Sequence, residues 1–321
     1  MQFRSLLSAL LLAVALLLLG TAAGAQDWPN KPVRVLVNFA PGGSTDNATR
    51  PFMEKLSTAL GQQFVIENKG GASGAIGAEA AAKFAPDGYN FLATPVASMT
   101  ILPNARRTAY DPFRDFVPVA QFADSTLTFT VHPSVPANSI KEFVEYAKKN
   151  PGKIHFGSAG LGTLTQMIGE QLNIVAGIHI VHVPYRGGAE AMADFLAGHV
   201  LAFTEGNVLP HVAAGKAKLL AVVDAERHPD FPHVPTMNEI YPEYDILNWF
   251  GIFAPTGTPD AVVRRLNAEV NKAAQLPELR AHLLKLALRP RVSTPEELGK
   301  RLRQDFDRYG AMVKALNIEM N

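Results

Sequence analysis

The sequence contains no cysteine among its 321 residues. This absence excludes disulfide bonds, zinc sites built on thiolates and cysteine nucleophiles. Neither sign of charge is in excess, because 30 Lys and Arg residues are mixed with 29 Asp and Glu residues. The balance leaves no electrostatic footprint for nucleic-acid binding. No long apolar run follows the N-terminal one, so we expect no membrane-spanning helix in the mature chain.

The N-terminal apolar run has the features of a secretory signal peptide over residues 1–25. Arg4 supplies the positive start, residues 6–19 form the apolar core, and Ala23-Gly24-Ala25 fits an A-x-A cleavage site. We expect cleavage after Ala25. Without a cysteine next to the signal there is nothing to lipidate, so a soluble mature chain is expected.

Residues 33–94 show the alternation β-α-β-α-β. Strands are predicted at 33–37, 64–67 and 89–94, and helical segments from about 44 to Gly61 and at 76–84. Pro51 lies inside the first helical pattern and is expected to kink the helix or delay its start. The alternation is typical of a parallel sheet covered by helices.

A second block of the same kind is predicted over residues 153–223. Its strands are expected at 153–156, 179–183, 200–204 and 218–223, with helices at 164–173 and 189–197. The segment 224–235 is polar and rich in proline, and is predicted to be a linker or a crossing of the chain back to the first block. Between the two blocks, strands are expected at 117–122 and 127–132 and a helix from 139 to about 149. A strand at 249–254 and three helices are expected after the linker.

Three predicted strand-to-helix turns are rich in glycine and hydroxyl groups, at 41–46, 157–163 and 184–189. A helix start offers unpaired N–H groups and a positive dipole end to an anion. In open α/β sheets ligands bind at the carboxyl ends of strands. If the two blocks face each other, the turns would converge in a cleft. The lack of a clustered Lys/Arg pair suits a carboxylate better than a phosphate.

Other chemistry is weakly supported. The stretch around Gly157-Ser158-Ala159-Gly160 resembles a nucleophile elbow, but Phe156 stands where the first glycine of G-x-S-x-G is needed. A secreted α/β hydrolase that uses Ser158 stays open as an alternative, and would need a nearby histidine and acid. His179 and His182 are three apart on a predicted strand and should point to opposite faces, which disfavours a shared metal. We expect no metal and no cofactor.

A series of short motifs runs along the whole mature chain. They are, in order, residues 28–34 (WPNKPVR), 41–46 (PGGSTD), 67–72 (ENKGGA), 86–89 (PDGY), 150–153 (NPGK), 157–160 (GSAG), 183–188 (VPYRGG), 234–236 (VPT) and 249–255 (WFGIFAP). In this order the motifs resemble those of the Bug family, the periplasmic solute-binding receptors of tripartite tricarboxylate transporters.

The resemblance implies a two-lobed α/β fold of the type II periplasmic-binding-protein (Venus-flytrap) class with a ligand cleft between the lobes. Lobe 1 would comprise residues 26–125 and 229–321, and lobe 2 residues 126–228. It further implies a monomeric periplasmic receptor without enzymatic activity. Such a receptor would bind a di- or tricarboxylate, an acidic amino acid or an aromatic acid, and deliver it to membrane subunits of the transporter. An orphan ligand sensor of the same fold stays open.

In this family the loops equivalent to 41–46 and 184–189 clamp one carboxylate, largely through backbone amides and ordered waters. The resemblance therefore implies ligand contacts from the following residues: Phe39, Pro41, Gly42, Gly43, Ser44, Asp46, Ser98, Ser158, Ala159, Thr163, Gln166, Tyr185, Gly187, Gly188, Ala189 and Glu205. Gln166 and the segment 203–207 differ from the commoner family pattern, which leaves the group bound at the far end of the ligand open.

Overall fold

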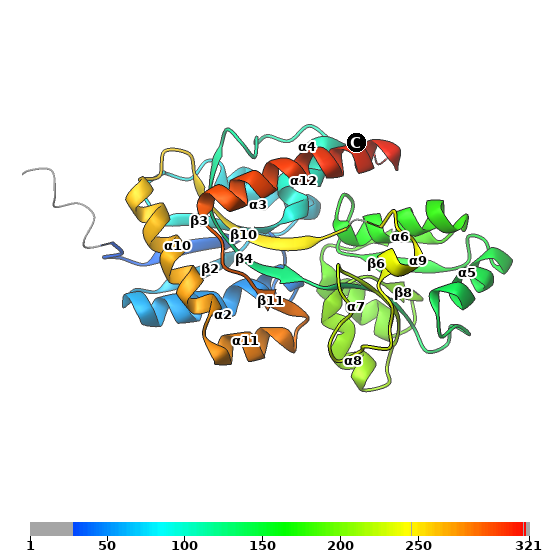
Figure 1. Cartoon of the computed structure of the whole chain (residues 1–321). Coiled ribbons are helices and arrows are strands. Elements are labelled where there is room, and N and C mark those ends of the chain that lie inside the picture. Colours follow the sequence, from blue (N-terminus) through cyan, green and yellow to red (C-terminus); the bar gives the residue numbers. More distant parts are fainter. Residues whose placement is uncertain (1–27, 245, 317, 319–321) are drawn as a thin grey trace, which may run out of the picture.

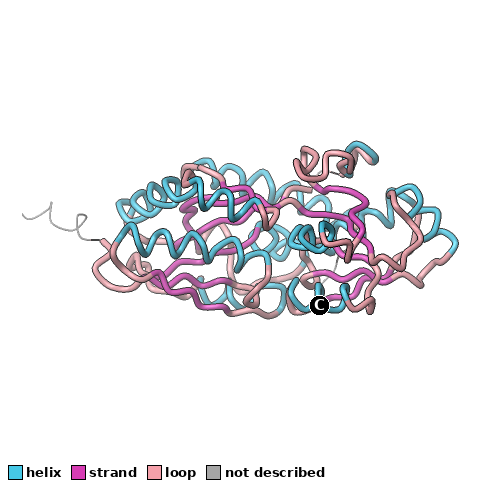
Figure 2. Tube along the Cα trace, turned by 90° about the horizontal axis from the view of Figure 1, so that it is seen from below, coloured by secondary structure: helices cyan, strands magenta, loops and turns pink. Residues whose placement is uncertain are grey.

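The structure, a computed structural model, describes residues 28–244, 246–316 and 318. The predicted signal peptide, 1–25, lies outside the described residues. The described chain forms two separate mixed sheets with helices around each of them, side by side along the long axis of the molecule (Figures 1 and 2). None of the described helices is both long and apolar enough to cross a membrane.

The first sheet has six strands in the order β11-β4-β10-β3-β1-β2. Their bounds are β1 (Val33–Val37), β2 (Phe64–Asn68), β3 (Asn90–Pro95), β4 (Phe116–Ser125), β10 (Asn248–Pro255) and β11 (Leu288–Pro290). Strand β1 pairs in parallel with β2 and β3, whereas β10 is antiparallel to β3 and β4. The expected parallel β-α-β-α-β block is confirmed for β1 to β3.

Helices cover this first sheet on both faces (Figure 1). They are α2 (Ser44–Leu60), α3 (Ala75–Ala81), α4 (Val96–Ala105), α10 (Asp260–Ala274), α11 (Pro277–Leu284) and α12 (Pro295–Ala315), with a 3₁₀ turn η1 (Ala72–Gly74). Helix α2 runs through Pro51 from Ser44, so the expected delay of its start is wrong. Its buried stripe, which includes Ala48, Phe52 and Leu56, packs on the sheet and outweighs the lost backbone bond.

The second sheet has five strands in the order β7-β6-β8-β5-β9. Their bounds are β5 (Leu127–Val131), β6 (His155–Ser158), β7 (Val181–Pro184), β8 (Ala202–Phe203) and β9 (Lys218–Val223). Around it lie α5 (Ile140–Lys149), α6 (Leu164–Ala176), α7 (Gly188–Leu196), η2 (Gly206–Val208), α8 (Leu209–Ala213) and α9 (Met237–Ile240). Strand β6 is parallel to β7 and β8, as predicted for a second α/β block.

The chain passes between the sheets twice. It leaves the first sheet at the end of β4 and enters the second at the start of β5, with Thr126 between them. On the return, Thr236 forms a parallel bridge with Val222 of β9, and Gln171 Nε2 donates to the carbonyl of Glu243 at 2.8 Å. The expected lobe boundary at 228/229 therefore falls inside a segment that packs on the second sheet, and β10 is where the chain rejoins the first.

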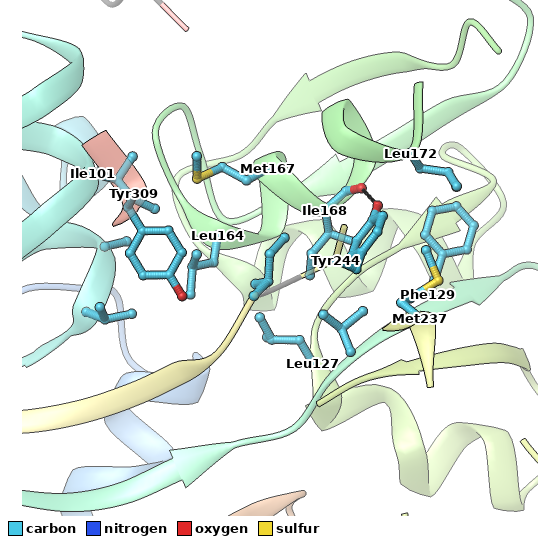
Figure 3. Close-up of a cluster of buried hydrophobic side chains, with 14 of the residues drawn as sticks. Ile101, Leu127, Phe129, Leu164, Met167, Ile168, Leu172, Met237, Tyr244 and Tyr309 are labelled. Atoms are coloured by element: carbon cyan, nitrogen blue, oxygen red, sulfur yellow. Dashed lines mark hydrogen bonds between the residues drawn. The ribbon is translucent and has the colours of Figure 1, made fainter. Parts of the chain in front are cut away.

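A single cluster of buried apolar side chains runs through both halves. Figure 3 shows its middle, where Ile101 of α4 and Tyr309 of α12 approach Leu164 of α6, and Ile168 continues towards Phe129 of β5. Tyr244 donates a hydrogen bond to the carbonyl of Ile168, which fastens the return segment to α6. This packing fixes the start of α6 relative to the first sheet.

Candidate functional site

Three helix starts meet at one cleft between the two sheets. The cleft holds about 570 Å³ of empty space, part of it open to solvent, and its lining includes the first residues of α2, α6 and α7. The predicted turns 41–46, 157–163 and 184–189 all contribute to it, which confirms their convergence. The full lining consists of Phe39, Ala40, Gly43, Ser44, Thr45, Pro95, Ala97, Leu127, Ala159, Thr163, Leu164, Thr165, Gly187, Gly188, Ala189, Glu205, Asn248 and Phe250.

Helices α2 and α7 begin without a side-chain cap. Their N-cap residues are Gly43 and Gly187, which have no side chain to accept from the first-turn N–H groups. Helix α6 differs, because the Thr163 hydroxyl accepts from the N–H of Gln166 and Gln166 Oε1 accepts from the N–H of Gly162 at 2.7 Å. The two uncapped starts thus leave N–H donors and positive dipole ends at the cleft, one from each sheet.

Asp46 holds the turn before α2 in place through hydrogen bonds. This buried carboxylate accepts from the N–H of Gly42 at 3.0 Å, from Asn68 Nδ2 at 2.9 Å and from Arg50 Nη2 at 2.7 Å. Burial alone would raise its pKa, but the bonds from Gly42, Asn68 and Arg50 outweigh this and hold the pKa below its usual value. Asp46 therefore fixes the turn and does not line the cleft.

Glu205 reaches the cleft from the loop after β8. Only 4% of the residue is exposed, and its Oε2 accepts from the Ser44 hydroxyl at 2.8 Å. Burial raises the pKa of Glu205 to about 7, and the bond from Ser44 lowers it only in part. A Cβ added at Gly188 would lie 2.1 Å from Oε1, so the carboxyl group rests directly against the start of α7.

Nine of the sixteen expected contact residues line the cleft: Phe39, Gly43, Ser44, Ala159, Thr163, Gly187, Gly188, Ala189 and Glu205. The other seven lie around it: Pro41, Gly42, Asp46, Ser98, Ser158, Gln166 and Tyr185. Ser98 is fully buried and accepts from Asn38 Nδ2 at 2.9 Å. The hydroxyl of Tyr185 donates to Asp194 at 2.7 Å, and burial together with Asp194 raises the pKa of Tyr185 to about 12.

Ser158 forms a pair with His182. Its Oγ lies 2.5 Å from His182 Nε2 and also accepts from the N–H of Gly160 at 3.1 Å. Burial lowers the pKa of His182 to about 4. Within the part of the chain that the structure describes, no carboxylate is hydrogen-bonded to His182, and the fully buried Ser158 does not line the cleft. A hydrolase would need a histidine beside the serine, and His182 is there. Among the described residues, however, no carboxylate supports His182, and Ser158 is not exposed to a substrate in the cleft.

His179 and His182, considered above as a metal-binding pair, do not share a strand. Strand β7 begins at Val181, so it includes His182 but not His179. No group of three or more His, Cys, Asp or Glu side chains among the described residues is placed to hold a metal ion.

Sequence reasoning predicted Phe39, Ala159 and Ala189 but missed the rest of the apolar lining. Leu127 starts β5, Leu164 starts α6 and Phe250 lies in β10, so each is a core-type residue of a regular element. Nothing in the local pattern separates these positions from ordinary core positions. By contrast, Thr165 directly follows a predicted turn, and the hydroxyl pattern there could have identified it.

Comparison with known proteins agrees with this geometry. Residues 48–318 match the family described as "Tripartite tricarboxylate transporter family receptor". The chain is similar to the protein BugT of Bordetella pertussis, at 32% identity over 95% of this chain and 96% of that protein.

Two solved structures have the same two-sheet architecture. The periplasmic binding protein BugD has a TM-score of 0.87 at 32% identity, covering 92% of this chain and all of its own. Rpa4515 of R. palustris, solved with adipate, has a TM-score of 0.87 at 31% identity, covering 91% of this chain and 99% of its own. These likenesses extend over both sheets and the cleft between them.

Proposed function

Because the chain belongs to the tripartite tricarboxylate transporter receptor family, whose members are solute-binding receptors, we propose that it captures a small carboxylate in the cleft between its two sheets and delivers it to the membrane subunits of a tripartite transporter. Its role is capture and release of the solute, without chemical conversion.

The two uncapped helix starts support a carboxylate as the bound group. Gly43 begins α2 on one side of the cleft and Gly187 begins α7 on the other, and both line it. A carboxylate between them can accept from N–H groups of both helices and interact with two positive dipole ends. The adipate in Rpa4515, a relative at 31% identity, is a ligand of this kind.

We assign direct ligand contacts to the nine expected residues that line the cleft, and supporting roles to the seven around it. Lobe 1 comprises residues 26–125 and the C-terminal part, and lobe 2 the intervening segment, which starts at 126 and includes the return segment up to β10. Closure of these lobes on the ligand is a hinge motion about the two passages between the sheets. The protein acts as a monomer.

Periplasmic location follows from the expected signal peptide and suits a receptor that serves a transporter. Intact-mass measurement of protein purified from the periplasm should give a chain that begins at Gln26. Retention in the cytoplasm of an unprocessed chain would contradict this location.

The test of capture is a thermal-shift screen of the processed protein with small carboxylates of one, two and three acid groups, amino acids and aromatic acids. Each acid is paired with its uncharged amide as control. A ligand at one hundred times its dissociation constant adds about 2.7 kcal/mol, which raises the melting temperature by several degrees. A shift with an acid that disappears with its amide is the expected result. No shift with any carboxylate, in protein shown by native mass spectrometry to hold no small molecule, would contradict the proposed function.

A further inference from the structure

The cleft contains an acid and no base. Of the described residues that line it, Glu205 alone has an ionisable side chain. All others contribute apolar groups, hydroxyls, one amide or backbone. A ligand therefore meets one ionisable side chain among the described lining residues, and it is an acid that is negatively charged above its pKa of about 7.

The carboxyl group of Glu205 has little to balance its charge. Oε2 accepts from the Ser44 hydroxyl at 2.8 Å, and no described residue forms a hydrogen bond with Oε1. No Lys, Arg or His forms an ion pair with it among the described residues. A buried carboxylate with one neutral partner is costly, and a positive group beside it would recover much of that cost.

Glu205 also sits where the ligand carboxylate is proposed to bind. Its hydrogen-bond partner, Ser44, is the first residue of α2, and its two oxygens lie 2.1 and 2.2 Å from the place of a Cβ on Gly188, the first residue of α7. Any group of the ligand that touches Glu205 is therefore close to the ligand's own carboxylate. An ionised Glu205 repels any carboxylate placed beside it, including the ligand's own, unless a positive group of the ligand lies between the two, because like charges interact strongly at short range in a site of low dielectric.

On the basis of the proposed function, we propose that Glu205 binds an ammonium group of the ligand, so that the cleft takes an α- or β-amino acid with an uncharged remainder and disfavours dicarboxylates. The ammonium group supplies the counter-charge that Glu205 lacks. The carboxylate of the same ligand takes the N–H donors of α2 and α7.

The remaining lining fits an apolar side chain on that amino acid. Apolar groups come from both sheets and from α6, namely Phe39, Pro95, Ala97, Leu127, Leu164 and Phe250. None of these can compensate a further charge. For the second carboxylate of a dicarboxylic acid, the described lining offers the hydroxyls of Thr45, Thr163 and Thr165 and the amide of Asn248, but no positively charged partner.

Matched ligands of the same carbon skeleton test this inference by titration calorimetry at pH 8. Each amino acid with an uncharged side chain is compared with the acid that lacks only the amino group, such as leucine with 4-methylpentanoate. In a second comparison, 2-aminohexanoate is set against adipate, the dicarboxylate with the same number of carbon atoms. At least one amino acid should bind ten times or more tightly than its deaminated acid and than adipate. Tighter binding of deaminated acids or of adipate would overturn the inference and leave the proposed function standing. If no carboxylate binds, both are wrong.

Two variants separate the charge of Glu205 from its other effects. Glu205→Gln keeps an acceptor for Ser44 but removes the charge, and should lower the preference for the amino acid over its deaminated acid at least tenfold. Glu145→Gln removes the same charge from an exposed position on α5, outside the cleft, and should leave the preference unchanged. An unchanged preference in Glu205→Gln, or an equal loss in both variants, would overturn the assignment.

Discussion

The hydroxyl of Ser44 donates a hydrogen bond to Glu205 across the cleft at 2.8 Å, although the two residues are 161 positions apart in the chain. Ser44 opens α2 beside the first sheet, and Glu205 follows β8 of the second. This bond therefore links the two halves through two residues that line the cleft. Opening of the cleft has to break it, and it leaves the Glu205 carboxyl with no described hydrogen-bond partner.

Glu205 should make the ligand-free protein less stable as the pH rises. Its pKa is 4.5 in an unfolded chain and about 7 in the fold, so the folded state binds more protons between these values. Stability from this group is then fully present below pH 4.5 and falls until about pH 7, by at most about 3 kcal/mol. Glu205→Gln removes this dependence and should unfold at higher denaturant concentration than the wild type at pH 8.

Denaturant titrations of both proteins at pH 8 and at pH 4.5 measure this effect. The advantage of Glu205→Gln should be largest at pH 8 and small at pH 4.5, where Glu205 is protonated in the fold and half protonated in the unfolded chain. A variant that is less stable than the wild type at pH 8 would show that the carboxylate is well solvated or paired, against the geometry described here.

Ligand binding should require glycine at position 188 because there is no space for a side chain. The helical backbone there would itself accept other residues. A Cβ at this position would overlap the carboxyl end of Glu205, at 2.1 to 2.3 Å, and a side-chain end can move away. Gly188→Ala should therefore fold but displace Glu205 and lower ligand affinity tenfold or more, as measured by calorimetry. In the control Gly299→Ala, near the start of α12 and outside the cleft lining, the new Cβ meets Pro118 Cγ at an ordinary 3.5 Å. Wild-type affinity in folded Gly188→Ala would refute this close contact.

The strand-turn-helix order of the first half could be predicted because glycine turns separate buried strands from amphipathic helices. Helix α4 could not. Every residue from Val96 to Leu102 is buried, so no alternation of apolar and polar positions marks it as a helix. Strand β11 is three residues long and ends at Pro290, which leaves too little pattern to recognise.

The turns that form the site were predictable, but the direction of their side chains was not. Ser44 and Asp46 are two positions apart, about 200° around α2, so one points into the cleft and the other under the turn. Both are polar residues at a helix start and look alike in the sequence. The contact of Glu205 with Gly188 depends on how β8 and α7 pack, which no local pattern records.

Ser158 should have no role in catalysis. Its Oγ is buried and shared between His182 and the N–H of Gly160, and Ser158 does not line the cleft. Neither the wild type nor Ser158→Ala should hydrolyse p-nitrophenyl acetate above the buffer rate, whereas Ser158→Ala should lose about 1–2 kcal/mol of stability because buried polar partners are left unpaired. Ester hydrolysis that disappears in Ser158→Ala would revive the hydrolase alternative.

Asp46 should stabilise the fold above pH 4 and support binding without touching the ligand. Since the fold holds its pKa below the unfolded value of 3.8, its stabilisation is fully present above 3.8 and is lost as the pH falls from there through the lower pKa of the folded state. Asp46→Asn turns one acceptor oxygen into a donor facing Gly42 or Arg50, and should cost about 1.5–3 kcal/mol at pH 7. Ligand affinity should fall as well, because the turn that carries Gly43 loses its support.

Asp260→Asn is the matched control, since Asp260 also lies in the first turn of a helix and pairs with an arginine four residues on at 2.7 Å. The Asp260 side chain is 73% exposed, against 5% for Asp46, and exposed pairs of this kind contribute about 0.3–0.5 kcal/mol. Denaturant titration at pH 7 should therefore separate the two variants clearly, and the separation should shrink below pH 4. Equal small losses would mean that Asp46 acts only as an ordinary surface pair with Arg50, and that the turn before α2 holds its shape without it.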